Sequence, residues 1–131
     1  MSAPIGQPRT WLRLEGLAVF IVSLYFYKTQ LASWTMFAVL FLVPDLSMTG
    51  YLAGSKVGAR LYNLAHNEVA PLFLIVYSLT AGRADIVAYG LIWTAHIGLD
   101  RALGMGLKYP DDFRSTHLGH IGKPQKRRFT L

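Results

Sequence analysis

The chain has 131 residues, of which 53% are hydrophobic and only 15% are charged, and its formal net charge is +6. This composition allows one domain and is typical of an integral membrane protein rather than of a soluble one. The chain contains no cysteine, which excludes disulfide bonds, thiolate metal ligands and a cysteine nucleophile.

Four apolar runs follow one another along the chain, each close to the length that crosses the hydrocarbon core of a bilayer. The connections between them are short, so neighbouring runs are expected to form antiparallel hairpins. Within the third run, Pro71 is expected to kink the helix. The sequence therefore predicts an all-α fold, an integral membrane up-down four-helix bundle in residues 1–107. Its predicted spans cover about residues 12–27, 35–53, 57–81 and 86–105.

The C-terminal part of the chain is more polar. Residues 108–122 have too few apolar side chains to form a span, and we expect them to fold back as a short cytoplasmic cap on the bundle, with a disordered segment as the alternative. Residues 123–131 form a basic tail, expected to be disordered beside lipid headgroups. Nucleic acid is not a predicted partner, because the KPQKRR run has no interleaved aromatic residue.

The basic residues are distributed unevenly between the two ends of the predicted bundle. Of 13 Lys and Arg residues, only Lys28 and Arg83 fall at the end opposite the N-terminus. Cytoplasmic loops carry the excess of Lys and Arg in membrane proteins. The sequence thus predicts a protein of the bacterial inner membrane, with the lipid bilayer around it and both termini in the cytoplasm. The remaining basic residues are Arg9, Arg13, Lys56, Arg60, Arg101, Lys108, Arg114, Lys123, Lys126, Arg127 and Arg128.

Four ionisable residues interrupt the apolar runs at similar depth. Asp45, His66 and His96 each lie about eight or nine residues from the cytoplasmic end of their spans, or about 12 Å at 1.5 Å per residue. Asp100 lies one helical turn after His96, on the same face. Ionisable groups inside a membrane are costly and by default functional. Each residue could instead have a structural role. Asp45 could form a hydrogen bond to a neighbouring helix, and His66 could donate one to a carbonyl group. Asp100 could simply hold the His96 imidazole on the same helix.

Several stretches of the chain resemble one protein family. The strings RLEGLAVF, PDLSMTGYLAG, YNLAHN, AHIGLDRALGMGLKY and FRSTHLG, spread from about Arg13 to Gly119, are similar to small, mainly bacterial integral membrane proteins catalogued as domain of unknown function 4260. The resemblance implies a four-span membrane protein and supplies no activity. Its motifs contain the four polar residues and five more that we expect to bind substrate or support the site: Glu15, Asn63, Arg101, Tyr109 and His117.

The leading hypothesis for function is an enzyme that acts on a lipophilic small molecule by acid–base catalysis, through isomerisation, cyclisation, or epoxide or ester hydrolysis. Buried carboxyl groups are commonly tuned as acids, and histidine is a base near neutral pH. In this hypothesis, Asp45 is the acid or orients a water molecule, and Asp100 steers His96 as the base. His66 and Asn63 donate hydrogen bonds to a developing oxyanion.

Two alternatives stay open. No metal or other cofactor is predicted outright, but Asp45, His66, His96 and Asp100 include the ligand types that bind divalent metal ions, so a metal-dependent membrane enzyme or metal-binding protein is the second hypothesis. No HExxH motif is present. The third hypothesis is a transporter or a binder of lipophilic ligands, for which a homo-oligomer would have to supply the rest of the path.

Overall fold

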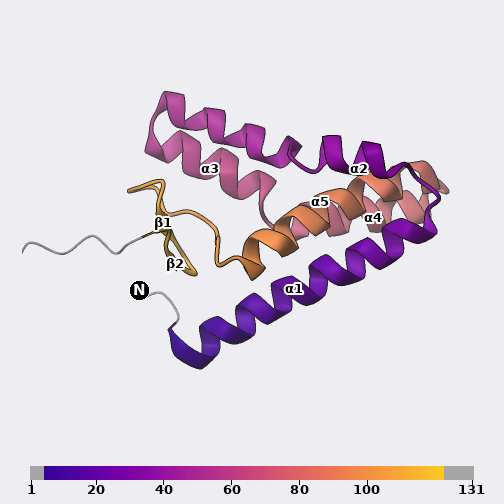
Figure 1. The fold of residues 1–131 in the computed structure, drawn as a ribbon. Helices are drawn as coiled ribbons and strands as arrows, with labels where there is room; N and C mark the ends of the chain where they lie inside the picture. Colours follow the sequence, from indigo (N-terminus) through magenta and orange to yellow (C-terminus); the bar gives the residue numbers. More distant parts are fainter. Residues whose placement is uncertain (1–4, 123–131) are drawn as a thin grey trace, which may run out of the picture.

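Helices make up most of the protein in a computed structural model that describes residues 5–122 (Figure 1). The expected all-α class is confirmed at this level, and the only strands within the described range form a two-residue hairpin after the last helix. The elements are α1 (Gly6–Thr29), α2 (Trp34–Leu40), the 3₁₀ helix η1 (Val43–Ala53), α3 (Ser55–Ala65), α4 (Val69–Thr80), α5 (Ala84–Ala102), β1 (Ser115–Thr116) and β2 (Gly119–His120).

The chain runs back and forth along the molecule in four passes (Figure 1). The first pass is α1, the second is α2 with η1, the third is α3 with α4, and the last is α5. The start of α1 and the turn between η1 and α3 lie toward one end, as does the β1–β2 hairpin, whereas the α1–α2 and α4–α5 connections lie at the other. In the η1–α3 turn, Gly54 has a φ of 113°, a conformation that glycine adopts without a Cβ clash.

Helices α1 and α5 pack closely because glycine residues face each other. A Cβ atom on Gly98 would lie 2.7 Å from the backbone nitrogen of Phe20 and 2.8 Å from the carbonyl oxygen of Gly16. A Cβ atom on Gly16 would lie 2.8 Å from the carbonyl oxygen of Gly98. Small residues at such contacts let helix backbones approach each other. The approach fixes the position of α5, the most buried helix, against α1.

Aromatic residues hold the α1–α2 connection against the rest of the protein. The Tyr27 ring is fully buried, and its hydroxyl group donates a 2.6 Å hydrogen bond to the carbonyl oxygen of Ser33. The Ser33 side chain in turn accepts from the amides of Thr35 and Met36, which caps α2. The ring of Phe37 packs 5.0 Å from that of Tyr27. Together these contacts place α2 so that the following segment lies over α5.

The second and third passes are interrupted rather than continuous. In the second pass, α2 ends at Leu40 and the backbone continues as a 3₁₀ helix that has Pro44 in its first turn. In the third pass, the expected kink at Pro71 is wrong: the helix breaks earlier, at residues 66–68. Pro71 instead lies in the first turn of α4, where its missing N–H group is not needed. The Asn67 side chain accepts from the amide of Ala70 and caps the new helix.

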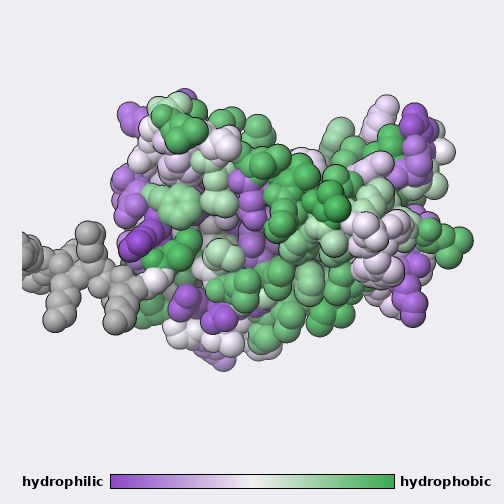
Figure 2. Space-filling model, turned by 45° about the horizontal axis from the view of Figure 1, so that its top comes forward, coloured by the Kyte–Doolittle hydropathy of each residue, from purple (hydrophilic) through white to green (hydrophobic). Residues whose placement is uncertain are grey.

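Much of the outer surface is apolar. Residues 6–29 and 34–53 form two helical stretches that are long and apolar enough to cross a membrane, and only 17% and 6% of their most apolar windows are buried. Exposed large apolar side chains also cover α4, including Phe73, Val76 and Leu79. On the face shown in Figure 2, hydrophobic residues extend across the middle and hydrophilic ones gather toward both ends, apart from a hydrophilic group within the middle.

Candidate functional site

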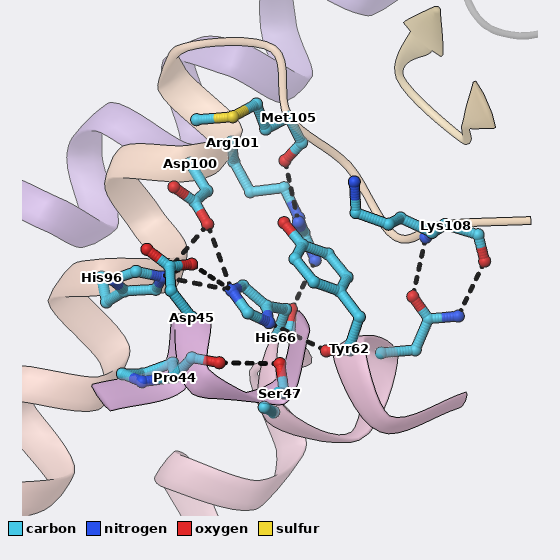
Figure 3. A network of polar contacts seen from close by, with 12 residues as sticks. Pro44, Asp45, Ser47, Tyr62, His66, His96, Asp100, Arg101, Met105 and Lys108 are labelled. Atoms are coloured by element: carbon cyan, nitrogen blue, oxygen red, sulfur yellow. Dashed lines mark hydrogen bonds and ion pairs between the residues drawn. The ribbon is translucent and has the colours of Figure 1, made fainter. Parts of the chain in front are cut away.

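The four polar residues singled out in the sequence meet at one point (Figure 3). The Nε2 atom of His66 lies 3.1 Å from Nε2 of His96, 3.2 Å from Oδ1 of Asp45 and 3.5 Å from Oδ2 of Asp100. The Nε2 atom of His96 lies 3.2 Å from the same oxygen atoms of Asp45 and Asp100. One ligand atom from each residue thus lies within 4.8 Å of the other three. We call this group the Asp/His centre.

The break in the third pass positions His66. Its backbone ends α3 with φ −117° and ψ 17°, outside helical geometry, so its side chain can point back along the helix. The Nδ1–H group donates a 2.8 Å hydrogen bond to the carbonyl oxygen of Tyr62, and the imidazole stacks on the Tyr62 ring at 3.7 Å. A carbonyl oxygen only accepts, so neutral His66 carries its proton on Nδ1. Its Nε2 lone pair therefore faces the centre.

His96 and Asp100 come from the middle of α5, one turn apart. Both side chains are almost completely buried, and their spacing places them on one face of the helix. The ring of His96 packs edge-on against Phe41 at 5.1 Å, at the interruption of the second pass. Its Nδ1 atom is buried and has no hydrogen-bond partner among the described residues. Packing therefore orients this imidazole more than hydrogen bonding does.

Asp45 is the most accessible member of the centre. It lies in the first turn of η1, and its side chain is 35% exposed, whereas those of His66, His96 and Asp100 are almost fully buried. The regular helix of the second pass ends before Asp45, at the interruption between α2 and η1. On η1, the Asp45 carboxylate lies 3.2 Å from both imidazole nitrogens. The centre consequently has three buried members and one member on its open side.

Arg101 supports the backbone behind the centre. Its guanidinium group donates a 2.7 Å hydrogen bond to the carbonyl oxygen of His66 and a 3.0 Å bond to that of Met105. The first of these carbonyls belongs to the helix break and the second to the chain just after α5. The guanidinium group thus ties two irregular backbone segments together.

A buried lysine was missed in the sequence. Lys108 follows α5, and its Nζ atom lies 4.5 Å from the centroid of the Tyr62 ring and 3.5 Å from that of Phe113. It also donates a 2.7 Å hydrogen bond to the Phe113 carbonyl oxygen. Burial lowers the pKa of this ammonium group, while Asp100, Asp112 and Asp45 act in the opposite direction. Lys108 thus contacts the Tyr62 ring, which stacks on the imidazole of His66. These residues are far apart in the chain, and no local motif indicates the contact.

The segment after α5 folds back onto α3. Asn63 donates to the carbonyl oxygen of Lys108 at 2.8 Å and accepts from its amide at 2.7 Å. The amide of Leu107 donates a 2.8 Å hydrogen bond to Nδ1 of His117. Burial, followed by the charge of Arg101, lowers the pKa of His117. Asn63 and His117 therefore fasten this segment rather than point into the centre. The basic tail at 123–131 lies outside the described residues.

Two of the expected supporting residues lie away from these contacts. Glu15 is exposed on α1, and within residues 5–122 it makes no hydrogen bond or ion pair. Tyr109 is 40% exposed, and its backbone amide bonds the carbonyl oxygen of Ser115. The structure therefore brings Arg101 directly to the backbone of the centre, and Asn63 and His117 to the contacts between α3 and the segment after α5. Tyr109 is part of that segment, and Glu15 belongs to neither group.

The family of the chain can now be stated. A family model described as domain of unknown function DUF4260 matches residues 9–121. The chain belongs to this family. The match confirms the resemblance seen in the sequence and includes the whole Asp/His centre, together with Tyr62, Arg101 and Lys108. No curated protein and no solved structure matches the chain.

Proposed function

We propose that this protein is an integral membrane enzyme that holds one divalent transition-metal ion in the Asp/His centre and uses the ion on a small lipophilic molecule. The observation that carries the proposal is the spacing of three buried ligand atoms, those of His66, His96 and Asp100, with the Asp45 carboxylate beside them. Nitrogen and oxygen ligands about 2.0–2.2 Å from a tetrahedral ion lie about 3.3–3.6 Å from one another. The contacts among the ligand atoms of His66, His96 and Asp100 range from 3.1 to 3.5 Å, and Oδ1 of Asp45 lies 3.2 Å from each imidazole nitrogen.

The protonation of the centre also favours a cation between its members. The Nε2 atom of neutral His66 is an acceptor, because Nδ1 carries the proton, and it faces two carboxylate groups and another imidazole nitrogen. The His66 nitrogen and the two carboxylates are three acceptors, and at this distance they repel one another unless positive charge lies between them. A divalent ion would offset both carboxylate charges at once. Imidazole with carboxylate is a ligand set that zinc and ferrous iron accept.

The unequal burial suggests different roles within the centre. His66, His96 and Asp100 are buried and form a set of two imidazoles and one carboxylate, which is the composition of catalytic sites that keep one position open. Asp45 lies on the accessible side. There it is placed to accept a proton from a water molecule bound at the open position. The proposal therefore keeps the water-orienting role expected for Asp45 and makes His96 a ligand instead of a base.

Hydrolysis is the reaction class that uses all four residues. A water oxygen forms a bond to the electrophilic carbon of an ester or epoxide while the carbon–oxygen bond of the substrate breaks. The water proton passes to Asp45 and from there to the leaving oxygen, so that atoms and charge balance. A divalent ion held by His66, His96 and Asp100 would polarise the water and offset the developing negative charge.

The surface supports a location within a bilayer. Two stretches long enough to span are largely exposed, whereas the apolar core helix of a soluble protein would be buried. The two helix interruptions occur at His66 and just before Asp45, where irregular backbone lies inside the protein around a polar centre. This is the setting in which membrane proteins tolerate broken helices.

Metal analysis of the purified, zinc-loaded and dialysed protein tests the proposal. We expect about one equivalent of ion in the wild type and at least a tenfold loss in His66→Ala and in His96→Ala. His120→Ala is the matched control, because this histidine is partly exposed and lies 3.8 Å from Asp112, outside the centre. A wild type without a stoichiometric ion, or equal loss in all three variants, would contradict the metal centre.

A metal-free acid–base centre is the second candidate. The observation that favours it is that the 3.2 Å contacts of Asp45 and Asp100 with the imidazoles also fit charge-assisted hydrogen bonds. It requires the same two carboxylates but no ion. A wild type that stays folded and active after exhaustive chelation would favour this candidate over the metal centre.

A further inference from the structure

An apolar cavity adjoins the Asp/His centre. It has a volume of about 320 Å³ and lies between η1, the end of α3 and the first half of α5. Three of its lining residues are neighbours of the centre in the chain: Pro44 precedes Asp45, Ala65 precedes His66, and Ile92 lies one turn before His96. The cavity and the centre are therefore consecutive sections of the same helix interface.

The cavity offers almost no free hydrogen-bonding group. The indole N–H group of Trp93, which lines it, already donates a 2.6 Å bond to the carbonyl oxygen of Ala65. The hydroxyl group of Ser47, also in the lining, donates a 2.7 Å bond to the carbonyl oxygen of Pro44. The remaining lining is mainly aliphatic. Such a cavity stabilises hydrocarbon and discriminates against polar groups.

The position of the cavity along α5 gives its occupant a direction. Residues 89, 92, 93, 96 and 100 lie on one stripe of the helix, with the cavity at the start of the stripe and the centre at its end. The side chain of Val43 at the cavity and that of Leu42 beside it are exposed, so the entrance opens among apolar groups. An amphipathic molecule entering there would bring its polar end to Asp45.

We infer that this cavity binds the hydrocarbon chain of the substrate, a single-chain lipophilic molecule with about ten methylene groups behind a polar end. The length follows from the volume, since about 30 Å³ is the share of one small group such as water. The inference rests on the proposed function, because the polar end is the part that the Asp/His centre transforms. It names the substrate class as lipophilic molecules with one polar end and one hydrocarbon chain.

Fluorescence quenching of Trp93 by 10-bromodecan-1-ol tests the inference without needing a metal. Replacing Trp11 and Trp34, both exposed, by Phe leaves Trp93 as the single tryptophan. With the protein in lipid nanodiscs, we expect saturable quenching by the bromodecanol and at least tenfold weaker quenching by 3-bromopropan-1-ol. Quenching that rises linearly without saturation, or equally for both alcohols, would overturn the inference.

A matched pair of variants on η1 localises the effect. Ser47 and Thr49 both donate their hydroxyl groups to the carbonyl three residues earlier, at 2.7 and 2.8 Å, but only Ser47 lines the cavity and Thr49 is exposed. Ser47→Phe should weaken the saturable quenching at least tenfold, whereas Thr49→Phe should leave it unchanged. Equal effects in the two variants would overturn the inference.

The two proposals fail in different measurements. If Trp93 is not quenched saturably but the wild type retains one equivalent of metal, the chain-binding inference is wrong and the metal centre stands. If quenching follows the expected pattern and no metal binds, the cavity stands and the metal centre is wrong.

Discussion

Arg101 shows how a single residue can hold the geometry of the centre without contacting its ligand atoms. Its two hydrogen bonds join the carbonyl groups of His66 and Met105, which belong to segments 39 residues apart. A guanidinium group donates along several directions in a fixed plane, and an ammonium group cannot reproduce that fork. Charge alone is therefore not enough at this position.

Arg101→Lys should lower metal affinity about tenfold, because His66 loses the bond that fixes its backbone. Arg83→Lys is the control, since Arg83 is exposed and, within residues 5–122, is paired with Asp85 alone, at 2.9 Å. Competition with a fluorescent chelator measures both affinities. An equal affinity in the two variants would show that Arg101 does not position His66.

Acidification should release the segment that follows α5. The pKa of His117 is lowered in the folded protein, so the docked imidazole stays neutral. In the undocked segment the same imidazole takes up a proton below its ordinary pKa of 6.5. The stability of docking is therefore complete above about pH 6.5 and falls as the pH is lowered further, by at most about tenfold per pH unit. Protonation also removes the acceptor for the Leu107 amide.

The measurement is the amide hydrogen-exchange protection of residues 105–118 at pH 7.5 and at pH 5.5, corrected for the intrinsic exchange rate. The amides of α1 serve as the internal reference. His117→Gln should remove the pH dependence. Protection that is constant, or that grows on acidification, would contradict the account.

At the residue scale, the sequence was sufficient to identify the members of the centre but not its surroundings. The depth of each polar residue could be counted along its predicted span, which placed Asp45, His66, His96 and Asp100 at similar depth. In the structure these four residues meet. Tyr62 and Lys108 could not be found in this way. Their contact depends on the chain folding back after α5, and on Asn63 fixing the backbone of Lys108, neither of which leaves a periodic signal.

At the scale of elements, the closest helix contact should be the least tolerant of added volume. Gly98→Val would place a side chain against backbone atoms of α1 at 2.7 and 2.8 Å, and backbone cannot move aside as a flexible side chain can. We expect a loss of about 1–3 kcal/mol in the free energy of unfolding, as for other overpacked sites. Ala18→Val, exposed on α1, is the control and should change stability little. Unfolding in mixed micelles measures both, and equal stability would refute the close packing of α1 and α5.

The existence of the four passes could be predicted from apolar runs, but their interruptions could not. Pro71 drew attention as a helix breaker, yet proline in a first turn is compatible with a helix. The actual break at residues 66–68 is stabilised by the Asn67 cap and by Arg101, a tertiary partner. The 3₁₀ helix η1 likewise packs against α3, an element that follows it in the chain. Local sequence describes neither contact.

At the scale of the whole molecule, the proposed membrane topology makes opposite ends of the chain accessible from opposite sides. The protein has no native cysteine, so single-cysteine variants report without background. Thr29→Cys, at the end of α1, should react with a membrane-impermeant maleimide in intact cells. Lys56→Cys, at the start of α3, should react only after the cells are permeabilised. Labelling of both sites in intact cells, or of Lys56→Cys alone, would contradict the topology.

X-ray absorption at the metal edge of the loaded protein in lipid shows whether the buried Asp/His centre holds a divalent metal ion. We expect two imidazole nitrogen ligands together with carboxylate or water oxygens, at about 2.0–2.2 Å. His66→Ala should reduce the imidazole contribution from two to one in whatever ion it still binds. A spectrum with only oxygen ligands, or one that is unchanged in His66→Ala, would contradict the account.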